Sequence, residues 1–454
     1  MHNFVLFSQN LFCTTMSKCY NNIMKLSKEL LKLSSSISKQ KHKLYIVGGY
    51  VRDSILGLEN DDIDIVSDIP LEKLLEICKE LKIKTTNINK TFGTLQLTYG
   101  KEKFEFTRLR LDQYPEDGSH KPSQVSFTDD VEIDSRRRDF SINAIYYDIK
   151  SKEIIDPQDG QKDLENRVLR TTIPADIILR DDALRVLRAI RFTNTLGLKI
   201  EKKTFSAMKT FAPKLISITK ERIIKELNQI CVADQKYGVA KNTLIPLCNK
   251  LRLPKYLFNS RLEKVKFTKK DNTSFNGLSR TCRLIGFYAL TIKRFIKTYV
   301  NENQLAFITN MVLGINGIKE SNNTISAVEK IIRIYLNLTY NIDSLNASIN
   351  YLSSSDATRE IVDILLNKKA QKVLANHIAI VKEKNLPLSV HELKVSAQDL
   401  IEAGIEKVHI SKLLSTLYNQ VLNMSVENIK EDLLNIAIEI NRTFKEITQQ
   451  KEKL

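Results

Sequence analysis

The stretch LYIVGGYVRDSILGLENDDIDIVSD (44–68) decides the fold. Residues 44–47 are apolar and rich in β-prone types, so they predict a strand that runs directly into Gly48-Gly49. The residues after the glycines predict the start of a helix. Glycines let a backbone approach a ligand closely, and the amides at a helix start point at anions. This turn is therefore a candidate triphosphate cradle with Arg52 as a charged clamp, although a glycine pair alone also fits an ordinary tight turn.

Two carboxylates follow the turn, in Asp62-Ile63-Asp64. In a strand, residues i and i+2 project from the same face. Two carboxylates held side by side favour a bound cation, and hard oxygen ligands suit Mg²⁺. Such a pair can hold two divalent ions that activate an attacking hydroxyl and stabilise a leaving pyrophosphate. The alternative is a solvated acidic strand edge, which the nearby Asp61 and Asp68 support.

Further charged residues extend this candidate site. Glu105 lies between Phe104 and Phe106 in a predicted strand, so it is either a third metal ligand or an exposed strand residue. Arg138 ends a run of three arginines, which either binds phosphates or forms a solvated basic turn.

One predicted helix over 181–191 carries charges at three-residue steps, at Asp182, Arg185, Arg188 and Arg191. Successive members are surface neighbours, so an Asp–Arg pair can form at 182/185 while the later arginines extend a positive ridge. As structure, this is a salt-bridged helix face. As function, a carboxylate acceptor beside a guanidinium donor could hydrogen-bond the Watson–Crick edge of a base.

Composition points to a polyanionic partner. The chain has 454 residues with 70 Lys and Arg against 53 Asp and Glu, a formal net charge of +17. Nucleic acid is favoured over an anionic membrane, and the alternative is a general compositional preference for Lys, Asn and Ile. The length predicts several domains at about 100–200 residues each.

The chain divides into a mixed α/β region and a helical remainder. Residues 44–150 combine short apolar runs of strand character with a segment of helical periodicity at 71–81. The predicted strands are 44–47, 63–66, 94–99 and 104–110. From about residue 160 to Leu454 we expect helices, with the clearest amphipathic patterns at 180–198 and 220–232.

Targeting and redox signals are weak. The six cysteines show no CxxC spacing, so we expect reduced structural thiols. No run approaches the roughly 20 apolar residues that span a bilayer, which predicts a soluble protein without a membrane partner. Residues 1–40 carry a single acid, Glu29, but no Arg precedes Arg52. We expect a cytoplasmic protein, or a mitochondrial one if residues 1–40 are a transit peptide.

Together these segments resemble the class II tRNA nucleotidyltransferases, the CCA-adding enzymes, and the related bacterial poly(A) polymerases. Motif order and spacing agree over about 44–230, and 393–422 looks like the C-terminal tRNA-binding segment but lacks its usual glycines. The matching motifs are GGxVRD at 48–53, DxD at 62–64, the third-carboxylate strand at 104–110, RRDFSINA at 137–144, the EDxxRxxR-like helix from 181, and ERIIKEL at 221–227.

The resemblance implies an α+β protein with a polymerase-beta-like nucleotidyltransferase α/β head and an all-helical neck, body and tail. The implied parts are an N-terminal extension (1–40), the catalytic head (41–155), a neck with the nucleotide-selecting helix (156–235), and a body and tail that bind tRNA (236–454). The implied activity is template-independent addition of CCA to the tRNA acceptor end from CTP and ATP, with release of pyrophosphate.

The resemblance also implies residue roles. Asp62 and Asp64 would bind the catalytic Mg²⁺ ions, with Glu105 assisting. The implied nucleotide ligands are Gly49, Arg52 and Arg138 for the incoming nucleotide, Asp182 and Arg185 for the base, and Arg188 and Arg191 as support. Protein partners are not indicated.

Two departures bear on the activity. The acidic pair that usually reads Glu-Asp is Asp181-Asp182, which could loosen the base-reading residues. The loop at 111–122 has His120 and Lys121 where relatives commonly carry Arg. Members that add only CC are shortened in this loop, so its presence favours addition of A.

The alternatives are a poly(A) polymerase, a partial A-adding or CC-adding enzyme, and a catalytically inert RNA-binding protein. Against the first, residues 92–97 read FGTLQL and not the basic G[RK][RK]F signature associated with bacterial poly(A) polymerases. Against the last, the Asp62/Asp64 pair is intact.

Overall fold

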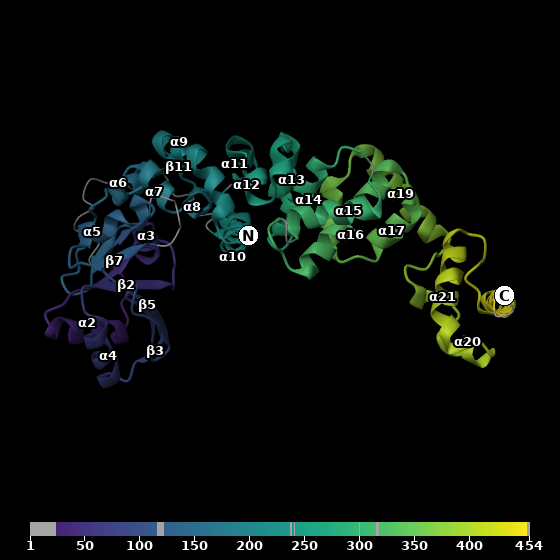
Figure 1. The fold of residues 1–454 in the computed structure, drawn as a ribbon, viewed down its shortest axis with the longest axis horizontal. Coiled ribbons are helices and arrows are strands. Elements are labelled where there is room, and N and C mark those ends of the chain that lie inside the picture. Colours follow the sequence, from purple (N-terminus) through teal and green to yellow (C-terminus); the bar gives the residue numbers. More distant parts are fainter. Residues whose placement is uncertain are drawn as a thin grey trace, which may run out of the picture. The chain divides into compact units, whose positions relative to one another are not determined.

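The computed structural model describes residues 24–115, 122–236, 238–239, 241–298, 300–314 and 317–451. The chain forms two compact units, Met1–Leu251 and Arg252–Leu454 (Figure 1). His120 and Lys121, as well as residues 1–23 of the expected extension, lie outside the described residues.

The first unit is built on a seven-stranded sheet, ordered β3-β4-β5-β2-β1-β8-β9. Neighbouring strands run antiparallel except β2 and β5, which are parallel. The predicted strands are confirmed as β1, β2, β4 and β5. The strands of the sheet are β1 (Leu44–Val47), β2 (Ile63–Ser67), β3 (Lys84–Asn89), β4 (Thr94–Tyr99), β5 (Glu102–Arg108), β8 (Tyr146–Asp148) and β9 (Ile154–Ile155).

Two amphipathic helices cover this sheet, α2 (Lys28–Lys39) and α4 (Leu71–Glu80), and they contact each other. The Ser27 side chain caps α2 by accepting a hydrogen bond from the amide of Leu30. Leu30, Leu33 and Ile37 on α2 are fully buried. Residues 28–39, which the sequence assigns to an N-terminal extension, are therefore a helix of the head.

Short elements surround the sheet. They are α3 (Gly49–Ile55), the antiparallel pair β6 (Arg110–Gln113) and β7 (Gln124–Phe127), α5 (Val131–Arg136), the 3-10 turn η2 (Ser141–Asn143) and α6 (Gly160–Glu165). The neck was expected to be all helical, but it contains a two-stranded parallel pair, β10 (Val168–Leu169) and β11 (Lys199–Ile200). Two-residue strands are too short for a periodic pattern to reveal them.

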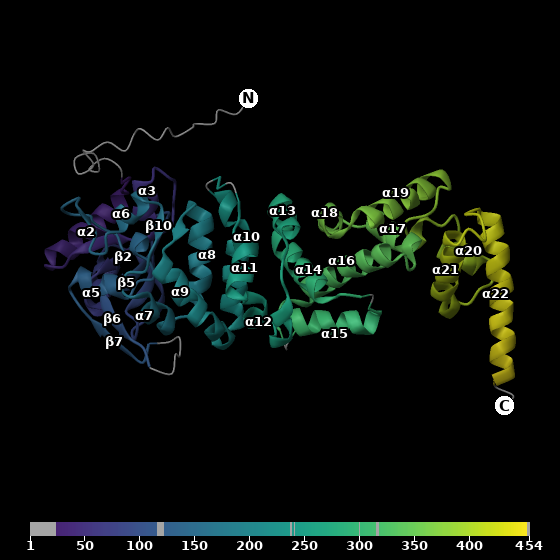
Figure 2. The same ribbon diagram turned by 90° about the horizontal axis from the view of Figure 1, so that it is seen from above.

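The remaining elements of the first unit are helices. The single helix expected over 180–198 is two, because Asp182 has an extended backbone (φ −146°, ψ 104°) that separates α7 from α8. Helix α8 lies against α10, which contains the predicted segment 220–232 (Figure 2). The helices are α7 (Ala175–Asp181), α8 (Leu184–Leu196), α9 (Lys202–Phe211), η3 (Ala212–Ser217), α10 (Lys220–Lys236) and α11 (Leu244–Leu251).

The second unit is helical throughout its described residues, as the sequence predicts. Its C-terminal part has its own core, which includes Leu400, Leu413, Leu417 and Leu433, all fully buried. Its helices are α12 (Leu253–Leu257), η4 (Ser260–Lys264), α13 (Lys269–Gly277), α14 (Arg283–Phe295), α15 (Glu302–Leu313), α16 (Asn322–Tyr340), α17 (Ser344–Leu352), α18 (Asp356–Leu365), α19 (Lys368–Glu383), η5 (Val390–Glu392), α20 (Ala397–Glu402), α21 (Lys407–Leu422) and α22 (Lys430–Lys451).

The sequence predicts reduced structural thiols and no membrane-spanning segment. The four cysteines that lie among the described residues, Cys78, Cys231, Cys248 and Cys282, are buried, and none of these four forms a disulfide. None of the described helices combines the length and apolar character that crossing a bilayer requires.

Candidate active site

The glycine turn places a backbone beside a carboxylate. Gly48 has φ +79°, which a residue with a side chain rarely adopts, and it precedes the first turn of α3. A Cβ at Gly48 would lie 3.6 Å from Oδ2 of Asp64. A Cβ at Gly49 would lie 3.3 Å from Nδ2 of Asn60. The turn therefore reaches the carboxylate of Asp64 without any side chain between them.

Strand pairing places the predicted carboxylates on neighbouring positions of the sheet. Asp64 lies in β2 and Asp62 directly precedes this strand, while Glu105 is the register partner of Asp64 in the parallel strand β5. Burial raises the pKa of Asp64 to about 6, and the charges of Asp62 and Glu105 add to this, against Arg138 and Arg188, which lower it. Carboxylates that repel one another in this way favour a cation between them.

The donor set fits a divalent cation whose coordination the substrate completes. Within the described part of the chain, no three His, Cys, Asp or Glu side chains converge closely enough to hold a metal by themselves. Asp62 and Asp64 offer hard carboxylate oxygens, and Mg²⁺-like ions commonly use one or two carboxylates together with substrate phosphates and water. Glu105 is exposed, and its role as a third ligand stays a prediction.

Arg52 is directed into the protein. Its side chain is almost fully buried, with Nε donating to Oδ1 of Asp53 at 2.7 Å and Nη1 to Oδ1 of Asn143 at 2.6 Å. Asp53 is also held by Asn60, whose amide donates to Oδ2 at 2.8 Å. In this arrangement Arg52 fixes the start of α3 to the segment after Phe140, and its predicted contact with a nucleotide stays a prediction.

A second buried cluster holds the other predicted phosphate ligand. Arg138 Nε donates to the Tyr146 hydroxyl at 2.8 Å and to Oδ2 of Asp134 at 3.2 Å. Burial alone would raise the pKa of Asp134, but Arg137 and Arg138 outweigh it and lower this pKa to about 2. Asp134 thus stays ionised at neutral pH and holds two arginines beside the sheet.

The neck helix α8 is bonded to the head through Asp139. Arg188 donates from Nε to Oδ2 of Asp139 at 2.8 Å, and Asn143 donates to Oδ1 of Asp139 at 3.1 Å. Burial would raise the pKa of Asp139, but Arg188 and Asn143 lower it to about 2. On the other side, Arg191 pairs with Glu226 of α10 at 2.9 Å.

Three predicted nucleotide ligands surround one aromatic ring. The guanidinium carbons of Arg52, Arg188 and Arg191 lie 5.3, 5.5 and 4.4 Å from the ring centroid of Phe192. These distances are within the range of cation–π contacts. Phe192 is buried, so it serves as a common anchor for arginines from α3 and α8.

The expected Asp182–Arg185 side-chain pair is replaced by two separate anchors. Asp182 Oδ2 accepts from Arg222 of α10 at 2.7 Å, and Oδ1 accepts from the Leu184 amide at 3.0 Å. Arg185 donates from Nη1 to the Ile178 carbonyl at 3.1 Å and from Nη2 to the Arg137 carbonyl at 2.9 Å. Asp182 has an extended backbone at the end of α7, and its carbonyl accepts from the Arg185 amide at 3.1 Å, while its carboxylate pairs with Arg222 on a different helix.

Sequence reasoning missed the residues that anchor this site. Asp139 and Asn143 lie inside the RRDFSINA motif, and Arg222 and Glu226 lie inside ERIIKEL, so these motifs contained the signal. Phe192 had no comparable signal, because an aromatic residue in an amphipathic helix is ordinarily a core residue.

Two protein-family models match this chain, one in the head and one in the neck. A family model described as the Poly A polymerase head domain matches residues 44–170. A second, described as a probable RNA and SrmB-binding site of polymerase A, matches residues 197–236. A CCA-adding enzyme of Streptococcus suis is 39% identical over 216 residues, covering 47% of this chain and 52% of that relative. The chain is thus similar to the head domain of poly(A) polymerases over residues 44–170 and to a CCA-adding enzyme over about half of that relative's length.

Another CCA-adding enzyme matches a larger share of the chain. A CCA-adding enzyme of Enterococcus faecalis is 27% identical over 421 residues, covering 90% of this chain and 95% of that protein. The match to the Streptococcus suis member, in contrast, spans about half of that protein's length.

Solved structures of CCA-adding enzymes share the fold. The Thermotoga maritima enzyme complexed with tRNA has a TM-score of 0.62 and 21% identity, and covers 92% of this chain and 97% of that one. The Bacillus stearothermophilus enzyme with CTP has a TM-score of 0.57 and 22% identity, with coverage of 92% and 98%. These similarities confirm the expected architecture of a nucleotidyltransferase head followed by helices.

Proposed function

We propose that this protein adds C, C and A to the 3′ end of tRNA without a template, using CTP and ATP and releasing pyrophosphate. The observation that carries the proposal is the position of Asp64, whose carboxylate lies beside the Gly48 turn and opposite Glu105 in the sheet. The relatives named above as CCA-adding enzymes support the same activity.

CCA-adding enzymes are nucleotidyltransferases that use divalent metals, and we assign Mg²⁺ to Asp62 and Asp64. When bound, the ion would activate the terminal hydroxyl of the tRNA and stabilise the leaving pyrophosphate. Gly48 adds no side chain beside Asp64, which suits the approach of the triphosphate. Arg138 and Arg188 supply the positive potential that favours a negative substrate there.

We assign base selection to Asp182 and Arg185. The Watson–Crick edges of C and A both present an amino donor beside a ring-nitrogen acceptor, whereas G and U present the reverse order. A carboxylate that accepts and a guanidinium that donates therefore match C and A and reject G and U. The anchoring of both side chains to backbone groups and to Arg222 supports this role, because fixed groups discriminate better than mobile ones.

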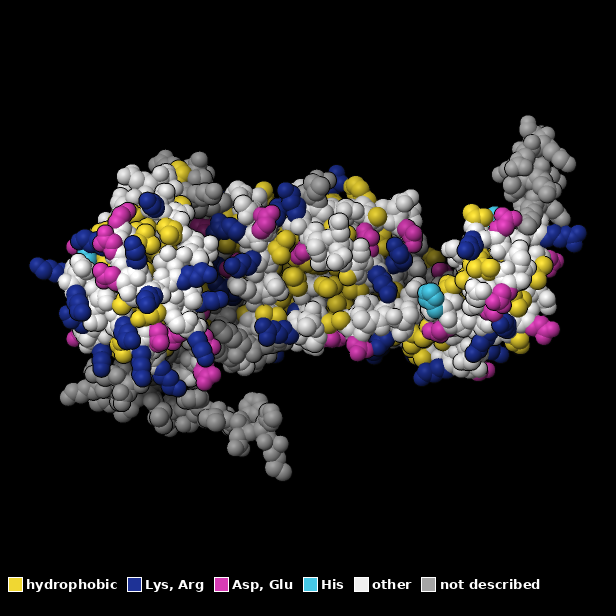
Figure 3. All heavy atoms as spheres, turned by 90° about the horizontal axis from the view of Figure 1, so that it is seen from below, with side chains coloured by type: hydrophobic (Ala, Val, Ile, Leu, Met, Phe, Trp, Pro, Cys, Tyr) yellow, Lys and Arg dark blue, Asp and Glu magenta, His cyan; other side chains and the backbone are white. Residues whose placement is uncertain are grey.

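We assign tRNA binding to residues 236–454 and a cytoplasmic location to the protein. On the face drawn in Figure 3, Lys and Arg side chains are spread over the described surface, with Asp and Glu between them. The net charge of +17 supports phosphate contacts that do not depend on sequence.

A poly(A) polymerase is the second candidate, because the family model that matches the head carries that description. Addition of only A or only CC is the third. One experiment separates them: tRNAs ending at the discriminator base, at C and at CC, and one RNA that is not a tRNA, are each incubated with labelled CTP and ATP. The proposal predicts that all three tRNAs come to end in CCA and that the other RNA is not extended. Failure to extend the first substrate, or long A tails on RNAs other than tRNA, would overturn it.

A further inference from the structure

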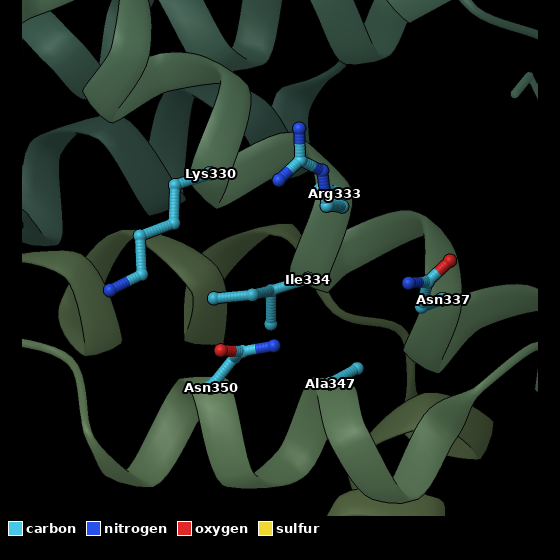
Figure 4. Close-up of a pocket in the computed structure, with 6 residues that line it drawn as sticks. All are labelled: Lys330, Arg333, Ile334, Asn337, Ala347 and Asn350. Carbon is cyan, nitrogen blue, oxygen red and sulfur yellow. The ribbon is translucent and has the colours of Figure 1, made fainter. Parts of the chain in front are cut away.

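The second unit contains a polar pocket that none of the preceding roles uses. It has a volume of about 280 Å³ and lies between helices α16 and α17 (Figure 4). Its lining residues are Lys330, Arg333, Ile334, Asn337, Ala347 and Asn350.

The sequence builds this pocket from one face of each helix. Positions 330, 333, 334 and 337 follow the i, i+3, i+4, i+7 spacing of a single helix face, and 347 and 350 are neighbours on the facing helix. The two helices are joined by a tight turn in which Asn341 and Asp343 adopt left-handed backbone conformations. The small side chain of Ala347 leaves room opposite Ile334, so the hairpin closes around a space.

The lining is positive and rich in hydrogen-bonding groups, with no acidic member. Lys330 is exposed, and Figure 4 shows its side chain extending from α16 toward the helix that carries Asn350. The structure assigns Lys330 no ion pair with the residues it describes. Arg333 pairs with Glu302 of α15 at 3.2 Å, but both side chains are largely exposed, and such pairs contribute little.

We propose that this pocket binds one phosphate and its ribose from the backbone of the tRNA substrate. Lys330, together with Arg333, supplies the positive charge that a phosphate requires. The amides of Asn337 and Asn350 can both donate and accept, which suits a ribose 2′-hydroxyl. Ile334 and Ala347 form an apolar floor against which the sugar packs. This inference rests on the proposed function, and it extends that function to a contact in the second unit.

Two variants test the charge of the pocket. Lys330→Ala removes a cation, and Lys79→Ala, an exposed lysine on α4 outside the residues assigned to tRNA binding, is its control. Asn350→Asp keeps the shape and adds a negative charge, and Asn87→Asp, an exposed position on β3 of the first unit, is its control. All four positions are exposed, so the fold should tolerate the changes.

The measurement is the dissociation constant of full-length tRNA at several salt concentrations. We expect Lys330→Ala and Asn350→Asp each to raise it about 5- to 10-fold near 0.1 M salt, and Lys330→Ala to reduce the salt slope by about 1. The two controls should stay within about 2-fold. If the wild type extends tRNA and the pocket variants bind it like their controls, the pocket inference is wrong while the proposed function stands. If the wild type neither binds nor extends tRNA, both are wrong.

Discussion

Nη2 of Arg188 lies 2.6 Å from Oδ2 of Asp139, which bonds helix α8 directly to the RRDF segment of the head. Asp139 also accepts from Asn143, and Asn143 in turn accepts from Arg52 at the glycine turn. This continuous series of hydrogen bonds connects helix α8, which contains the proposed base-selecting residue Arg185, with the turn beside Asp64. Asp139 is its central acceptor, so its charge should matter for stability.

Replacing Asp139 with Asn should destabilise the first unit. The variant leaves Arg188 without its principal carboxylate, and breaking a buried pair from one side typically costs about 3 kcal/mol. Because Arg188 is one-third exposed, we expect about 2 kcal/mol, seen as a lower midpoint in thermal unfolding. The control is Glu132→Gln, since the Glu132–Arg136 pair is more than half exposed and should contribute less than about 1 kcal/mol. Equal effects of the two variants would contradict the account.

Stability should fall in acid because of Asp134 and Asp139. Both carboxyls have folded-state pKa values of about 2, below their ordinary value of 3.8. The unfolded chain therefore binds more protons between these values, so this stabilisation is complete above about pH 5 and is lost as pH falls toward 2. Unfolding free energies measured from pH 5 to pH 2 should decline less steeply in Asp139→Asn than in the wild type. An exposed control, Asp129→Asn, should keep the wild-type slope, and an unchanged slope in Asp139→Asn would count against the burial of this charge.

Replacing Asp64 with Asn should abolish most nucleotide transfer but leave tRNA affinity nearly unchanged. A carboxylate that holds a divalent ion supplies several kcal/mol of transition-state stabilisation, so kcat should drop about 100-fold or more. The matched control is Asp61→Asn, an exposed neighbour outside the strand, which should retain activity within about 2-fold. Full activity of Asp64→Asn would refute the metal assignment.

Arg222→Ala should impair the choice of nucleotide. This arginine donates to Oδ2 of Asp182 at 2.7 Å, and without it the carboxylate loses one of the groups that orient it. We expect kcat/KM for both CTP and ATP to fall about 10-fold, and misincorporation of UTP or GTP to rise. Lys225→Ala, an exposed position on the same helix, is the control. Unaltered discrimination in Arg222→Ala would exclude a positioning role.

Local sequence patterns were sufficient to predict several strands of the sheet. β1 and β4 coincide with the predicted ranges, because their apolar residues are consecutive or alternate as buried strands require. Helix α4 likewise matches the periodic segment at 71–81. The register of Asp64 against Glu105 could not be predicted, since it depends on a parallel pairing of strands separated by about forty residues of chain.

The role of charged residues was harder to predict than their position. Arg52 was expected to face a ligand, yet its bonds to Asp53 and Asn143 are internal, and Asn143 lies 91 residues away in sequence. Asp182 was expected within a helix with Arg185, yet its partner is Arg222, 40 residues away. Spacing reveals partners on the same helix, but it contains no information about partners that tertiary packing supplies.

The most direct test of the central claim is the mass of the product formed from a tRNA that ends at its discriminator base. With CTP, ATP and Mg²⁺ present, we expect the tRNA to grow by two cytidylates and one adenylate and then to stop. We expect no growth when Asp64 is replaced by Asn. A product extended by adenylates alone, or an unchanged tRNA with the wild-type protein, would contradict the account.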